Sequence, residues 1–216
     1  MILTPINHAN LPEALARLAA SLCSPAARRV LRRIAGSGTG AGRATGGTAR
    51  RHHREALHIV RSFGITAHPG APSRGVTWDG RRLRVATESY ILLHEVAHYQ
   101  VAAPRRRRAI DFGLGTGTET GRRTVADRAV LLTGIRRERE EALASLLGIL
   151  WEASLGHPAL ASFLDQNWLE GAGRPGTAAH FEATLRQLCV AGLVDPRGKP
   201  TRRLRRRADG YSTVIG

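Results

Sequence analysis

Apolar residues recur at three- and four-residue spacings along most of the chain, which is the pattern of helices with one buried face. The pattern predicts helices over residues 11–22, 25–35, 52–64, 87–102, 125–133, 136–155 and 177–189. The helix over 136–155 is apolar nearly all round after Leu143, so we expect it to be buried. Two short extended segments, Val76–Trp78 and Arg82–Val85, flank Asp79-Gly80, a pair typical of a hairpin turn. The predicted fold class is therefore α+β, mostly helical with a small β element.

A stretch rich in glycine and threonine separates the first two predicted helices from the rest. Residues 36–50 read GSGTGAGRATGGTAR, a composition typical of a flexible linker. The first 50 residues also contain seven arginines and a single carboxylate, Glu13. We therefore expect residues 1–50 to form a basic, partly flexible N-terminal extension and residues 51–216 to form the main domain.

The charge of the chain points to an acidic partner. Its 216 residues include 33 Lys and Arg against 17 Asp and Glu, a formal net charge of +16. Such a charge favours either nucleic acid or an acidic protein. No helix-turn-helix, zinc-finger or ribonucleoprotein motif accompanies the arginines, and aromatic residues make up only 5% of the chain, which is poor material for base stacking. A nucleic-acid partner is thus possible but has no motif in its support.

The hydropathy of the chain indicates whether it contains a membrane span or a secretory signal. Hydrophobic residues make up 42% of the chain, enough for a core, yet no apolar run reaches the length of about 18 residues that a membrane span needs. The N-terminal segment lacks the basic start of a secretory signal and contains polar breaks. We therefore expect a cytoplasmic protein with no membrane partner.

The most informative motif is HExxH, formed by His94, Glu95 and His98 within the predicted helix 87–102. Positions i and i+4 of a helix lie on one face, about 6 Å apart between Cβ atoms, so both imidazoles can bind one metal ion. Glu95 lies beside that ion, where its carboxylate can accept a proton as the catalytic base. The motif predicts that 51–216 is a metal-dependent catalytic domain.

A third ligand has to come from elsewhere in the chain. Pro104 stands where an HExxHxxGxxH motif would need its third histidine, which excludes that class of metallopeptidase. Glu138 and Glu141, near the start of the helix predicted over 136–155, share a face. We predict Glu141 as the ligand, because the small Ala144 on the same side allows that face to pack closely against the histidine helix. Glu138 is the alternative, and the residue that is not a ligand would stabilise the positive end of its helix.

Two histidines and one carboxylate do not identify the metal. This set holds Zn²⁺ in metallopeptidases and Fe(II) in non-haem oxygenases. The residues alone therefore leave two reactions open, peptide hydrolysis and oxygen insertion.

Several segments together resemble the elongation factor P hydroxylase family over about residues 52–211. The resemblance is carried by Arg82–Val85, Tyr90, the HEVAH motif, Arg107 to Gly113 (RRAIDFG), Glu138 and Glu141, Gly156-His157-Pro158, Asn167 to Gly171 (NWLEG), and more loosely Phe181 through Gly192 to Tyr211. It implies a metalloprotease-like scaffold that serves as a hydroxylase (a monooxygenase) of the modified lysine of elongation factor P. It also implies iron as the metal, held by His94, His98 and a glutamate of the 138–141 cluster. An acidic elongation factor P would suit a chain of this charge.

The chain departs from the expected family pattern at Tyr99, where we expect tryptophan, and in its heavier arginine runs. Arg105–Arg108, close to the histidine helix, are candidates for contact with the substrate. Asp111 either orients a ligand histidine or caps a turn. The remaining histidines lack ligand spacing to one another, and we expect them to be structural or exposed: His52, His53, His58, His68, His157 and His180.

Overall fold

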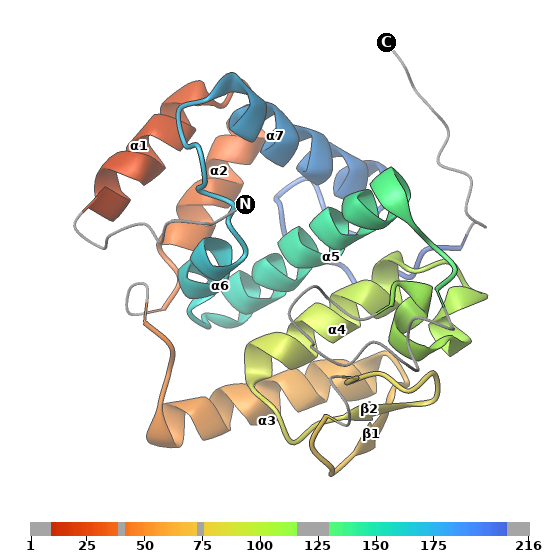
Figure 1. Cartoon of the computed structure of the whole chain (residues 1–216). Coiled ribbons are helices and arrows are strands. Elements are labelled where there is room, and N and C mark those ends of the chain that lie inside the picture. The colour runs from red at the N-terminus through yellow and green to blue at the C-terminus, as the bar shows by residue number, and fades with distance from the viewer. Residues whose placement is uncertain (1–9, 39–41, 73–75, 116–129, 207–216) are drawn as a thin grey trace.

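The computed structural model describes residues 10–38, 42–72, 76–115 and 130–206 (Figure 1). These residues form seven α-helices, two short strands and two short 3-10 helices. The elements are α1 (Leu11–Ser21), α2 (Pro25–Ala35), α3 (Gly46–Ser62), β1 (Thr66–His68), β2 (Arg82–Arg84), α4 (Ser89–Val101), η2 (Arg106–Arg108), η3 (Ile110–Gly113), α5 (Gly134–Leu155), α6 (Ala159–Asp165) and α7 (Pro175–Val190). The prediction of a mostly helical α+β fold is confirmed.

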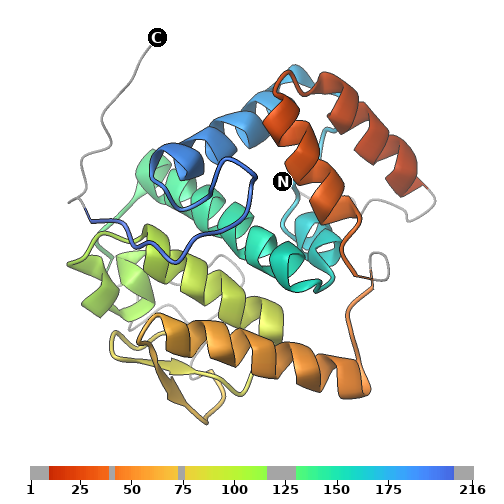
Figure 2. The same cartoon turned by 180° about the vertical axis from the view of Figure 1, so that it is seen from behind.

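Helices α4 and α5 lie side by side at the centre of the molecule, and the other helices cover them from two sides (Figure 1). Helix α3 packs on α4, while α2, α6 and α7 pack on α5. The view from behind shows the same order of helices (Figure 2). Both central helices have buried residues on several faces, and in α5 these lie mainly from Leu143 onward, where the sequence is apolar nearly all round.

The two N-terminal helices belong to the same core as the rest of the chain. Leu18 of α1 and Val30 and Ile34 of α2 are fully buried in it. The Ser24 hydroxyl accepts a hydrogen bond from the Ala27 amide and so caps the start of α2. The predicted boundary after residue 50 falls inside α3. Helices α1 and α2 of the predicted extension are therefore packed onto the main domain, because their apolar faces contact α5, α6 and α7.

The β element consists of two short parallel strands and a tight turn beside them. Strands β1 and β2 pair in parallel, with Ala67 opposite Leu83. The expected hairpin is present as a tight turn, in which Trp78 and Leu83 form an antiparallel bridge. Gly80 in this turn has φ 90°, and a Cβ there would lie 2.5 Å from the Arg108 carbonyl oxygen, so the turn needs glycine. The turn thereby sets the segment after α4 against the strand.

Most predicted helices are found within a few residues of their expected bounds. The helix predicted over 125–133 lies mainly outside the described residues, and residues 130–133 are not helical. The short helix α6 and strand β1 were not predicted. Nowhere in the described ranges does a helix combine the length and the apolar character needed to cross a membrane.

Candidate metal centre

The close approach of α4 and α5 brings the predicted ligands together. A Cβ added to Gly148 of α5 would lie 3.1 Å from the Cα of His94, so the two helices touch with almost no side chain between them. Glu141 lies two helical turns before Gly148 and therefore on the same face of α5. Its side chain faces the histidine side of α4 for this reason.

Three donor atoms converge between the two helices. His94 Nε2 lies 2.9 Å from His98 Nε2, and His98 Nε2 lies 3.4 Å from Glu141 Oε2. All three lie within 4.8 Å of one another. Bonds of about 2.0–2.2 Å at angles of roughly 90–110° place the ligands of one transition ion about 2.9–3.5 Å apart. The two measured separations thus fit a divalent ion such as zinc or iron.

The neighbouring glutamates have other positions. Glu138 is exposed and is not part of this donor group. Glu140 is fully buried and pairs through both carboxylate oxygens with Arg106, which is itself buried. Of the 138–141 cluster, Glu141 is therefore the one that the structure places beside the histidines, while its binding of a metal stays a prediction.

Charge at this centre is strongly coupled. Burial and the nearby His98 lower the pKa of His94 to about 3. Burial also disfavours the charged form of His98, but the Glu141 carboxylate outweighs it and raises the pKa of His98 to about 9. Burial by itself would raise the pKa of Glu141. The positive charge of His98 and its hydrogen bond have the larger effect and lower this pKa to about 2. The site thus holds an ionised carboxylate against the imidazolium of His98, and a cation bound there has to replace the proton on His98.

Glu95 points into the same buried region. It is 8% exposed, burial raises its pKa to about 8, and its Oε2 has no hydrogen-bond partner among the described residues. His98 Nδ1 likewise has no partner there, so Asp111 does not accept a hydrogen bond from it. Of the two roles left open for Asp111, a direct hydrogen bond to His98 is therefore absent, and orientation of His94 or capping of a turn stays a prediction.

The segment after α4 forms one wall of the site. The Phe112 ring stacks on the His98 ring, with centroids 5.5 Å apart and planes at 16°. Asp111 and Phe112 have φ of 47° and 53°, a left-handed conformation that is costly for residues with a side chain. Arg106 holds this turn by donating a hydrogen bond of 3.0 Å to the Phe112 carbonyl. A strained turn thus presents an aromatic face to His98.

Only two of the four clustered arginines are exposed to solvent. Arg106 is buried against Glu140, and Arg107 donates hydrogen bonds to the carbonyls of Tyr99 and Arg205. Arg105 and Arg108 are exposed. The expected contact with substrate is therefore open to these two, whereas Arg106 is buried and the half-buried Arg107 is engaged by backbone carbonyls.

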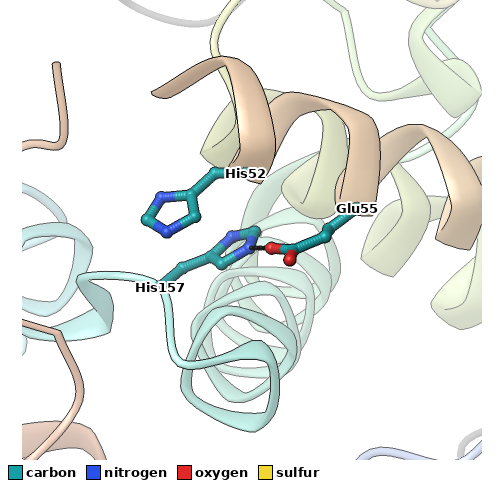
Figure 3. Close-up of side chains that lie close together, drawn as sticks. All are labelled: His52, Glu55 and His157. Carbon is teal, nitrogen blue, oxygen red and sulfur yellow. Dashed lines mark hydrogen bonds and ion pairs between the residues drawn. The ribbon is translucent and has the colours of Figure 1, made fainter. Parts of the chain in front are cut away.

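A second cluster of potential ligands was missed by the sequence interpretation. His52 and His157, which we expected to have no ligand spacing, lie beside Glu55 and each offers a donor atom within 4.8 Å of the others (Figure 3). Glu55 and His157 are 102 positions apart along the chain, so no local pattern could have joined them.

Comparison with known proteins adds no neighbour to this picture. No protein-family model, no curated protein and no solved structure matches the chain.

Proposed function

We propose that the chain is a metal-dependent hydroxylase of a protein substrate, with Fe(II) held by His94, His98 and Glu141. The observation that carries the proposal is the convergence of three donor atoms between α4 and α5 at separations that suit one ion. Two imidazoles and one carboxylate leave several positions of an iron ion free for other ligands, as non-haem oxygenases require.

The segment that resembles the elongation factor P hydroxylases supports this choice over other uses of the same ligands. That segment, Arg107 to Gly113, lies directly after α4, and its Phe112 ring stacks on His98. A resemblance located on a remote surface would have no bearing on the chemistry, whereas this one lines the candidate centre. In this proposal the scaffold is of the metalloprotease type and serves an oxygenase.

When bound, ferrous iron supplies the activation of dioxygen. Overall, one oxygen atom enters a substrate C–H bond and the other leaves as water, so a two-electron reductant has to be supplied. The chain contributes the surroundings of this reaction. In this proposal Phe112 and the buried faces of α4 and α5 exclude water, and the buried Glu95 accepts or returns a proton. Arg105 and Arg108 offer exposed positive charge to an acidic substrate such as elongation factor P.

A zinc metallopeptidase is the second candidate, and one observation favours it. Glu95 follows the first histidine directly, is buried, and has one carboxylate oxygen without a partner in the described part of the chain. In a peptidase this oxygen would be the general base that activates water on zinc. The same three ligands would serve both reactions.

The experiment that separates the two uses the full chain, loaded anaerobically with ferrous iron. It is incubated with lysine-modified elongation factor P, dioxygen and a reductant, and the substrate is analysed by intact mass. The hydroxylase proposal expects a product heavier by one oxygen atom, which is lost with His98→Ala. Chelator-sensitive cleavage of the substrate without added oxygen would support the peptidase instead. An unchanged mass in both arms refutes elongation factor P as the substrate.

A further inference from the structure

A second group of metal-type donors lies away from the centre between α4 and α5. His52 and Glu55 come from consecutive turns of α3, and His157 comes from the turn between α5 and α6 (Figure 3). One donor atom of each lies within 4.8 Å of the others. The cluster therefore joins two parts of the fold that are far apart in sequence.

His157 is the buried member of the group. It is fully buried, and its Nε2 lies 2.8 Å from Glu55 Oε2. Its Nδ1 is also buried and has no hydrogen-bond partner among the described residues. A buried polar nitrogen without a partner is costly, so its presence calls for an explanation. The contact with Glu55 accounts for only one of the two ring nitrogens.

His52 is the second imidazole of the cluster. Its ring stacks on the His157 ring, with centroids 4.0 Å apart and planes at 22°. Its Nε2 lies 3.4 Å from Arg51 Nη2. Because a guanidinium can only donate, His52 Nε2 is the acceptor in this contact and carries no proton. Burial lowers the pKa of both histidines, which keeps the imidazoles neutral as metal ligands must be.

We propose that His52, Glu55 and His157 form a second metal site, which takes a zinc-like divalent ion and is independent of the proposed catalytic centre. The His157 and Glu55 donor atoms, 2.8 Å apart, already have the separation of two ligands of one ion. The His52 ring is stacked on His157, so it has to turn for its lone pair to reach the same ion. The Glu55 side chain is 35% exposed and gives the ion access from solvent. The bound ion would fasten α3 to the end of α5, which makes its role structural.

The positive charge of Arg51 distinguishes a metal site from a cluster held only by hydrogen bonds. Its Nη1 lies 3.8 Å from Glu55 Oε1, and its side chain is 57% exposed. A cation at the cluster is repelled by this guanidinium, which has room to turn into solvent. Removing the positive charge should therefore strengthen metal binding, by about two- to fivefold for an exposed charge.

The test is a titration of the metal-free full chain with Zn²⁺ in competition with a chromophoric chelator. We expect two equivalents in the wild type, one in Glu55→Gln, one in His94→Ala and none in the double variant. Glu55→Gln retains an acceptor for His157 and loses the charged ligand. Glu13→Gln, which removes an exposed carboxylate paired with Arg17 on α1, is the matched control and should bind two equivalents.

The outcomes distinguish this site from the catalytic one. A wild type and a His94→Ala variant that both bind one equivalent, lost with Glu55→Gln, would support the second site and refute the first. Equal stoichiometry in the wild type and Glu55→Gln overturns the second site, and this comparison stands even if His94→Ala does not fold. Tighter zinc binding by Arg51→Gln is expected, and weaker binding would contradict the proposed position of the ion.

Discussion

Replacing Gly148 by alanine adds one methyl group at the contact between α5 and α4. The new Cβ would lie 3.1 Å from the Cα of His94 and 3.4 Å from its backbone nitrogen. Ordinary van der Waals contacts begin at about 3.4 Å, so α4 has to retreat by a few tenths of an ångström. The substitution therefore changes the spacing between the histidines and Glu141 without replacing any of the proposed ligands.

The size of the effect follows from the tolerance of metal coordination. Metal–ligand distances are held to about ±0.2 Å, and changes to the support of a site typically weaken metal affinity by about 10- to 100-fold. We expect a loss of this size in Gly148→Ala. Stability should fall by no more than about 2 kcal/mol, because alanine gains about 1 kcal/mol over glycine in a helix and the tight contact costs about 1–3 kcal/mol.

The assay is a competition titration with zinc or ferrous iron, with helix content checked by circular dichroism. Gly176→Ala is the matched control, since Gly176 also lies in a helix and a Cβ there would meet no atom within 4 Å. Wild-type affinity in Gly148→Ala would refute the idea that this contact sets the donor spacing. An equal loss in both variants would attribute the effect to alanine itself.

Three further predictions test other residues. Glu141→Gln should weaken metal binding by at least about 100-fold while Glu138→Gln leaves it unchanged, and the reverse result in the same titration would make Glu138 the ligand. Glu95→Gln should retain the metal and lose at least about 100-fold in turnover, since it removes the proton-handling carboxylate; undiminished turnover would exclude Glu95 from the reaction. Burial raises the pKa of Glu152 to about 7, despite Arg43 at 3.6 Å, so the folded state holds its proton more tightly than the unfolded state and stability falls as pH rises from about 4.5 to 7. Between pH 4.5 and pH 8 the wild type should lose about 3 kcal/mol in its free energy of unfolding through this group, and Glu152→Gln should not show this loss. Chemical unfolding of both proteins across this pH range measures the difference, and parallel pH profiles would contradict the prediction.

The catalytic candidates could be predicted because their geometry is local. His94 and His98 are one helical turn apart, so their common face follows from the periodicity of the helix alone. Glu141 needed only one more step, the expectation that a face with small residues packs closely on its neighbour. The structure shows this close packing at Gly148, where α5 contacts the backbone of α4 at His94.

Other features depend on packing that no local pattern records. The parallel pairing of β1 with β2 joins segments separated by a turn and a loop, and a three-residue strand has too few positions to show alternation. The left-handed Asp111 and Phe112 are held by the buried Arg106, whose partner Glu140 comes from α5. A run of arginines predicts an exposed face, so the burial of one member is visible only in the structure.

The burial of α1 and α2 has a related cause. A glycine-rich stretch of the kind found at 36–50 is typical of a linker between independent parts, yet the helices before it retain apolar faces that need a partner. Val30 and Ile34 find this partner in the core shared with α5. The composition of 36–50 predicted a linker, but residues 46–50 form the start of α3. The helices before this stretch pack into the core because their apolar faces are buried there.

The two proposed metal sites are linked through α4. This helix lies between α5, which supplies Glu141, and α3, which supplies His52 and Glu55. The spacing of a set of ligands is only as well fixed as the positions of the helices that carry them. Helix α4 is packed against a neighbouring helix on each side. An ion that ties α3 to His157 after α5 would close this arrangement around α4. The proposed structural site would thus support the spacing of the catalytic ligands from the side opposite Gly148.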